Sequence, residues 1–187
     1  MKLNSAMFKP GHGTLSAHLF ENPRVGVNRD LYWSVCFDFA PFEYDGGKVE
    51  LNCMVDWLVF PQPKSALQQS MSLSNSLYPK GEASCYFLGT HLEVSSWEFS
   101  LRPTEAAKRW ALEYELSVDF WNLEEDGSTE LKLVGTTDLE FGGFDIVKDN
   151  FAPKVTTSED AFDLLKQHIP IEEGWNCYDE GFRFVIR

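Results

Sequence analysis

The chain has 187 residues, a length at which one globular domain spanning residues 1–187 is the expected organisation. Sixteen Lys and Arg stand against 29 Asp and Glu, which leaves a formal charge of −13 at pH 7. A field of that sign repels phosphate backbones and anionic membranes, so it argues against nucleic-acid and membrane partners and favours a basic protein. Apolar residues are 43% of the chain, enough to build an ordinary globular core.

The cysteines indicate a reducing compartment. Cys36, Cys53, Cys85 and Cys177 are widely spaced and form no C-x-x-C pair. Residues 1–10 lack the apolar run of a signal peptide, and no stretch reaches the 18 apolar residues of a membrane span. We therefore expect a cytoplasmic protein with four reduced, mostly buried thiols.

The first patterned segments predict a β-hairpin. Residues 11–14 are glycine-rich but match no phosphate-binding motif, so they are interpreted as a flexible turn. Odd positions are apolar in residues 31–39 and again in residues 49–59, where they include Trp57 and Val59. The intervening residues 43–47 suit a tight turn. Odd must pair with odd to keep one face apolar, which places Cys53 opposite Phe37 and Cys36 near Met54.

The middle of the chain adds a loop and further strands. Residues 61–80, rich in Ser, Gln and Pro, predict one long loop with a helical turn at residues 66–71. Residues 84–88 and 92–101 are predicted strands, and a short helical turn is expected at residues 103–109. The clearest strand covers residues 110–121, with even positions apolar and Glu113, Glu115, Ser117 and Asp119 on the other face. A two-residue turn at residues 126–127 would then place Phe120 opposite Leu133.

The C-terminal part predicts one helix among strands. Residues 129–134, 139–144 and 182–186 are expected strands. Thr156 or Ser158 can cap a helix that continues to Ile169 and stops at Pro170. The fold prediction is therefore mainly β: an antiparallel β-sandwich or partly open barrel with one or two short helices.

No motif in the chain predicts catalysis or a cofactor. His12, His18 and His91 have no metal-ligand spacing, and His168 falls in the last turn of the expected helix, where the helix dipole favours a cation. No serine lies in a nucleophile context, and Cys85 reads as packing in an apolar strand. We predict no catalytic residue, no cofactor and no metal site.

Acidic and aromatic side chains supply the candidate binding residues. Residues 124–126 form a charged hairpin tip, and the pair Glu113 and Glu115 would suit a glycosidase, although a solvated strand face looks the same. Trp97, Trp121 and Trp175 would stack on a sugar or anchor a partner if exposed, and we expect the ring of Trp121 to be core. The candidate partner-binding residues are Glu115, Asp119, Trp121, Glu124, Glu125 and Asp126.

Two classes of function follow from these features. The first is a non-enzymatic, acidic protein-binding domain, comparable to an inhibitor or an immunity protein, that covers a basic protein. The alternative is a small-ligand or carbohydrate-binding β-sandwich module, or an enzyme with no linear motif.

Overall fold

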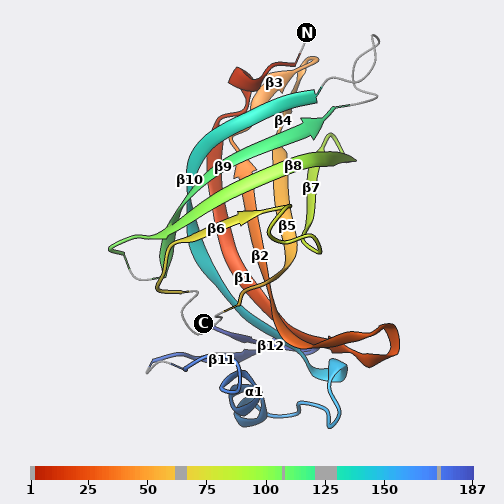
Figure 1. Ribbon diagram of the computed structural model, residues 1–187, viewed down its shortest axis with the longest axis vertical. Helices are drawn as coiled ribbons and strands as arrows, with labels where there is room; N and C mark the ends of the chain where they lie inside the picture. The colour runs from red at the N-terminus through yellow and green to blue at the C-terminus, as the bar shows by residue number, and fades with distance from the viewer. Residues whose placement is uncertain (1–2, 62–66, 107, 121–129, 172–173) are drawn as a thin grey trace.

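The computed structural model describes residues 3–61, 67–106, 108–120, 130–171 and 174–187, most of them in strands (Figure 1). The strands are β1 (Pro10–Asn22), β2 (Val27–Phe39), β3 (Phe42–Tyr44), β4 (Gly47–Val49), β5 (Leu51–Val59), β6 (Met71–Ser74), β7 (Glu82–Phe87), β8 (Thr90–Pro103), β9 (Arg109–Asp119), β10 (Glu130–Val147), β11 (Cys177–Asp179) and β12 (Arg183–Ile186). The helical elements are α1 (Ser158–Leu165) and the 3₁₀ turns η1 (Ser5–Met7), η2 (Pro23–Val25) and η4 (Lys148–Asn150). The mainly-β prediction is confirmed.

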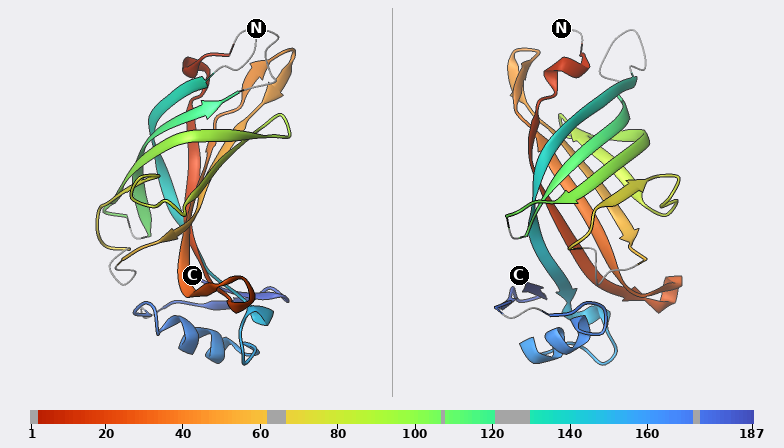
Figure 2. Two further views of the ribbon diagram at one scale, coloured as in Figure 1. Left: turned by 45° about the vertical axis from the view of Figure 1, so that its right-hand side comes forward. Right: turned by 60° about the vertical axis from the view of Figure 1, so that its left-hand side comes forward.

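One large sheet curls back on itself. Its strand order is β1-β2-β5-β7-β8-β9-β10-β12-β11, and β1 also pairs in parallel with β10. The other pairings of this sheet are antiparallel, and β6 joins it at β8. Figures 1 and 2 show β8, β9 and β10 curving across β1, β2 and β5, with α1, β11 and β12 beyond one end. Of the two arrangements expected, the partial ring corresponds to the partly open one.

Alternate side chains of each strand fill the inside of the ring. Phe37 lies opposite Cys53 and Cys36 opposite Met54, as the hairpin pattern predicts. The turn between β3 and β4 is also where the sequence predicts it. One continuous hydrophobic cluster runs from Leu3 to Ile186 and holds Trp33, Phe37, Phe87, Trp110 and Phe144 among its largest members.

The alternation of β5 breaks at Trp57. This residue has φ +61°, and the register against β2 shifts by one between the pairs Val35–Val55 and Trp33–Leu58. Such a bulge turns the following side chains to the other face. Leu58 is therefore buried, whereas Trp57 and Val59 are exposed, so their predicted inward orientation is wrong.

The glycine-rich segment at residues 11–14 is part of β1 and not a turn. A Cβ at Gly13 would lie 2.6 Å from the Cys36 carbonyl oxygen and 2.5 Å from Cδ2 of Leu139. Glycine therefore lets β1 fit between β2 and β10. The buried Thr137 of β10 donates a hydrogen bond of 2.6 Å to the Gly11 carbonyl and strengthens the same junction.

The predicted register of β9 and β10 is wrong by four positions. Leu133 lies opposite Leu116 and not opposite Phe120. Both pairings join an even to an odd position, so the apolar faces still coincide and the hydrophobic pattern alone cannot separate them. The predicted turn at residues 126–127 and residue 129 lie outside the described residues. The remainder of the expected strand at 129–134 and the expected strand at 139–144 belong to the single strand β10.

Cys53 and Cys85 form a disulfide, so the expectation of four reduced thiols is wrong. The two residues face each other across β5 and β7 with a Cα–Cα distance of 4.3 Å, and both are buried on the inner face. Cys36 and Cys177 are free. The bond depends on a strand pairing across 32 residues, which spacing in the sequence does not predict.

The helical predictions hold only in part. Helix α1 begins after Thr157, whose side chain and that of Asp160 form a capping box, and it ends at Leu165 before the expected Ile169. The long loop at residues 61–80 contains β6, and none of the described residues in 103–109 is helical.

Burial lowers the pKa of His168, which opposes the expected helix-dipole effect. No described helix is long and apolar enough to cross a bilayer.

We expect the substitution Gly13→Ala to destabilise the fold strongly. The added methyl group would overlap backbone and core atoms, and such overpacking costs about 1–3 kcal/mol of unfolding free energy. Urea denaturation measures the loss. Gly47→Ala is the control because the nearest atom to its Cβ, the Tyr44 carbonyl oxygen, is 4.0 Å away. Equal stability of the two variants would contradict the close packing of β1.

We expect two of the four cysteines to react with a thiol reagent in denaturant, and all four after reduction. Mass spectrometry of the alkylated protein counts them. Reduction should also lower the unfolding free energy by about 2–4 kcal/mol, because the bond closes a loop across 32 residues of the chain. Four reactive thiols without reductant would show that the bond is not formed.

Candidate acidic groove

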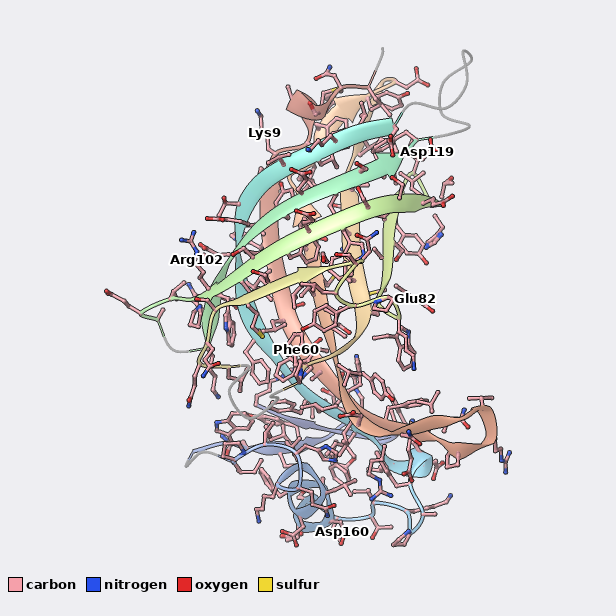
Figure 3. All side chains as sticks on the ribbon, viewed as in Figure 1. Lys9, Phe60, Glu82, Arg102, Asp119 and Asp160 are labelled. Atoms are coloured by element: carbon pink, nitrogen blue, oxygen red, sulfur yellow. A yellow bond between two sulfur atoms is a disulfide. The ribbon has the colours of Figure 1, made fainter. Side chains whose placement is uncertain are left out.

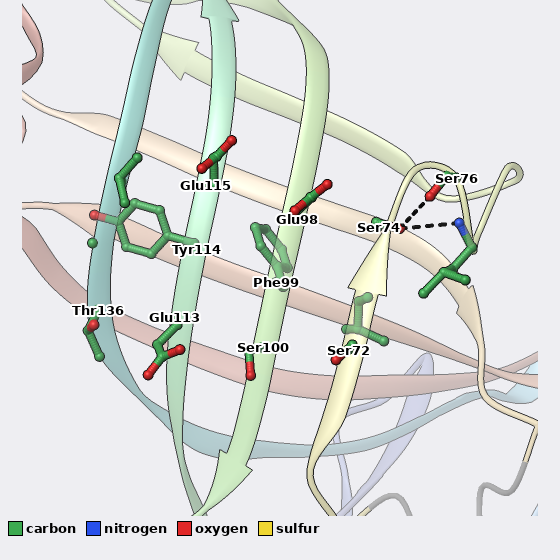
Figure 4. Close-up of a pocket in the computed structure, with 14 residues that line it drawn as sticks. Ser72, Ser74, Ser76, Glu98, Phe99, Ser100, Glu113, Tyr114, Glu115 and Thr136 are labelled. Carbon is green, nitrogen blue, oxygen red and sulfur yellow. Dashed lines mark hydrogen bonds between the residues drawn. The ribbon is translucent and has the colours of Figure 1, made fainter.

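An open groove of about 710 Å³ crosses the outer face of β6, β8, β9 and β10 (Figure 4). The alternation of these strands turns their apolar residues inward and leaves polar ones on the groove side. Three carboxylates line it, Glu98, Glu113 and Glu115. Hydroxyl groups complete the polar lining: Ser72, Ser74, Ser76, Ser100 and Thr136.

The carboxylates of the groove are incompletely neutralised. Glu98 of β8 lies directly opposite Glu115 of β9, and like charges in this position are unfavourable. Lys132 contacts Glu115 at 2.5 Å, and Arg102 forms an ion pair with Glu113. Glu98 has no ion pair with any described residue. The groove therefore retains negative charge on adjacent strands.

Two aromatic residues of the groove lining, Phe99 and Tyr114, turn their rings into the core and are nearly buried. The ring of Tyr114 packs against Phe37 with a centroid distance of 4.8 Å, and burial raises the pKa of Tyr114 to about 12. A Cβ at Gly135 would lie 2.5 Å from the Tyr114 hydroxyl oxygen, so glycine in β10 makes room for that group. Because its pKa is raised, the Tyr114 hydroxyl stays protonated at neutral pH.

A second row of carboxylates crosses the same strands beyond the groove. Glu93 of β8 and Glu130 of β10 both lie opposite Asp119 of β9. Four residues of strand separate Asp119 from Glu115, which is about 13 Å. The outer face of β8–β10 thus carries acidic side chains along much of its length, and Asp119 lies at the end away from Arg102 (Figure 3).

The structure brings together only part of the predicted binding set. Glu115 lies in the groove, and Asp119 is on the same face of β9 but does not line the groove. Trp121, Glu124, Glu125 and Asp126 lie outside the described residues. Sequence reasoning missed Glu98, because its place beside Glu115 depends on the pairing of β8 with β9.

The other tryptophans that were singled out are not open surface rings. Trp97 is buried in the core. Trp175 is half-buried and stacks on Phe144 at a centroid distance of 5.2 Å, with Lys108 over its ring. Both rings therefore contribute to packing and are not open to a ligand.

The histidines do not meet. His12 and His18 lie on β1 and line separate pockets, and His91 packs against Tyr86 at the start of β8. Within the described ranges, no group of three or more His, Cys, Asp or Glu side chains is placed to hold a metal ion.

The pocket that His12 lines also contains Cys36 and has a volume of about 510 Å³. The Asn52 amide donates to the Cys36 sulfur at 3.5 Å and to Asp38 at 2.5 Å. Burial raises the pKa of the Cys36 thiol, and the charges of Asp38 and Asp56 raise it further. A reactive cysteine needs the opposite environment, so this pocket does not activate its thiol.

Comparison with models of known protein families, with curated proteins and with solved structures finds no match. The interpretation of the groove therefore rests on its own residues.

We expect Glu98→Gln to raise the unfolding free energy by about 0.2–1 kcal/mol, because it removes the repulsion from Glu115. Thermal denaturation at low salt measures the change. The matched control is Glu43→Gln on β3, where the carboxylate lies opposite Lys48 and its removal should be slightly destabilising. A stability loss in Glu98→Gln similar to the control would show that the two glutamates do not repel each other.

Proposed function

We propose that this protein is a binding module for a basic protein and that the acidic groove is the centre of the contact. The observation that carries the proposal is the placement of Glu98 beside Glu115, with Glu113 next to them, in an open hollow. A net charge of −13 extends the same preference over the whole molecule.

A cationic side chain of the partner would relieve the repulsion that the groove contains. An Arg or Lys of the partner placed between Glu98 and Glu115 contacts two carboxylates at once. Hydrogen bonds between charged groups are stronger than those between neutral groups. The ion pairs of Glu113 and Glu115 are about half exposed, and such pairs contribute little to stability. They can therefore be exchanged for pairs with the partner.

The rest of the acidic face would guide the approach of the partner. Glu93, Asp119 and Glu130 form a row in register on the same three strands as the groove. Opposite charge over an extended face speeds encounter and gives an association that depends on salt. The hydroxyls of Ser100 and Thr136 can donate hydrogen bonds to the partner side chain that the carboxylates orient, or accept hydrogen bonds from it.

We also propose a cytoplasmic location, as the composition predicts. A disulfide is unusual there. Cys53 and Cys85 are at most 1% exposed, and this burial would shield their bond from soluble thiols.

An alternative function, a small-ligand module, is favoured by a separate aromatic pocket formed by Phe20, Tyr32 and Trp57. Trp97 and Trp175, which suggested this alternative in the sequence, do not support it. Catalysis draws no comparable support, because the lowered pKa values of Glu21, Asp160 and Asp179 are explained by an ion pair with Arg29, a helix cap and an ion pair with Lys148.

The test compares two triple variants of equal net charge, −13 + 3 = −10. One neutralises the groove (Glu98→Gln, Glu113→Gln and Glu115→Gln), and the other neutralises exposed carboxylates elsewhere (Glu43→Gln, Glu159→Gln and Asp163→Asn). Proteins retained from lysate at low salt are identified, and the dissociation constant of each purified candidate is measured by calorimetry. We expect a basic partner that binds wild type and the control alike and binds the groove variant at least about tenfold more weakly, or 1.4 kcal/mol. Equal binding by both triple variants would exclude the groove as the contact.

A further inference from the structure

A small pocket on the outer face of β1, β2 and β5 is walled by three aromatic rings. Its volume is about 280 Å³, and Phe20 of β1, Tyr32 of β2 and Trp57 of β5 line it. The ring centroids are 5.2 Å apart for Tyr32 and Trp57, 5.6 Å for Phe20 and Trp57, and 6.3 Å for Phe20 and Tyr32. The planes cross at 71–76°. The rings therefore form a corner of steep walls and not a flat platform.

The backbone turns an aromatic residue toward solvent at this place. The bulge in β5 and the positive φ of Trp57 leave its ring 38% exposed, although the alternation of the strand would bury it. A left-handed backbone is unfavourable for a bulky residue. The Tyr32 hydroxyl donates to the Asn28 carbonyl at 2.9 Å, which fixes the second wall.

The pocket also has negative charge that no described cation neutralises. Asp56 lines it, and Glu82 of β7 lies directly opposite Asp56. Neither carboxylate forms an ion pair or a hydrogen bond with a described residue. Glu82 is seen at the surface of β7 in Figure 3.

The one basic residue of the pocket lining, His18, and the arginines of the neighbouring strands are engaged with other acids. Arg29 makes two hydrogen bonds to Glu21, at 2.8 and 3.0 Å. His18, which also lines the pocket, lies 3.4 Å from Asp145, and Arg183 contacts the same carboxylate at 3.2 Å. Burial raises the pKa of the Tyr32 hydroxyl, and the charge of Asp30 raises it further. The negative charge next to the three rings is therefore that of Asp56 in the pocket lining and of Asp30 beside Tyr32.

We propose that this pocket binds a trimethylammonium group. The faces of Trp, Tyr and Phe rings attract a cation, and quaternary ammonium groups are commonly recognised by cages of such rings. The methyl groups would bury apolar surface against Phe20, Tyr32 and Trp57, while Asp56 supplies the opposite charge. This site is separate from the acidic groove and does not depend on the function proposed for it.

Other ligands fit the pocket less well. A primary ammonium is more strongly hydrated than a trimethylammonium group, so it loses more hydration free energy on entering a pocket with apolar walls. A sugar stacks on one flat ring face, whereas these rings stand at steep angles to each other. The volume of about 280 Å³ is also just below the range of drug-sized ligand sites, roughly 300–1,000 Å³, which suits a compact head group.

The test measures binding of choline and of its neutral isostere 3,3-dimethylbutan-1-ol to the full chain by NMR, with the indole signal of Trp57 assigned through Trp57→Phe. The two probes have the same shape and differ in charge. We expect choline to shift the Trp57 signal and to bind at least about fivefold more tightly than the isostere. Asp56→Asn should lower the affinity for choline severalfold while leaving that for the isostere unchanged. Because Asp56 is only half-buried and has no ion pair or hydrogen bond with a described residue, this variant should fold normally.

Two controls separate this pocket from other sites. Tyr86→Leu removes an exposed ring on the neighbouring strand β7 and should leave the affinity for choline unchanged. The groove triple variant should also bind choline like wild type, even where it loses a basic protein partner. Binding of choline with an affinity no higher than that of the isostere, or with an affinity that Asp56→Asn leaves unchanged, would overturn the proposal.

The source of the group is resolved by a second pair of probes, a peptide with one trimethyllysine and the same peptide unmethylated. Preference for the methylated peptide together with choline binding supports recognition of the group itself. Preference for the methylated peptide without choline binding supports a protein source of the same group. Failure of both choline and the methylated peptide to bind would overturn the proposal.

Discussion

The architecture depends on how closely β1 approaches its two neighbours. This strand pairs with β2 on one side and with β10 on the other, and only the second pairing turns an open sheet into a partial ring. Gly13 permits the contact, because a side chain there would collide with Cys36 and Leu139. The inward side chains of the other strands then face one another across the ring and form the core. The outward side of the same strands is the surface on which the groove and the aromatic pocket lie.

The local parts of this fold follow from the sequence, and the long-range parts do not. Alternation and turn chemistry fix Phe37 opposite Cys53, since the two strands are joined by a short hairpin. The same reasoning fails for Leu133, because a shift of four positions keeps the apolar face intact. β1 escapes prediction since its glycines resemble a turn, yet the alternation of Leu15, Ala17 and Leu19 is a signal that could have found it.

The candidate sites show the same division. The carboxylates of β9 fall on one face by simple alternation, so Glu115 is placed correctly from sequence. Its neighbour Glu98 is contributed by β8, and only the register of that pair brings the two charges together. The aromatic pocket needs three strands and a bulge. Trp57 follows the apolar pattern of β5, and sequence alone therefore assigns it to the core.

The junction of β1 with β10 also constrains the order in which the chain can fold. His12 pairs with Asp138, so β1 leaves the ribosome long before its second partner exists. Until β10 is made, β1 has one unpaired edge, which is a site for mispairing with other chains. Contacts between residues so distant in sequence form slowly, because a large loop must close first. The free edge of β1 is therefore paired only after β10, which begins at Glu130, has been synthesised.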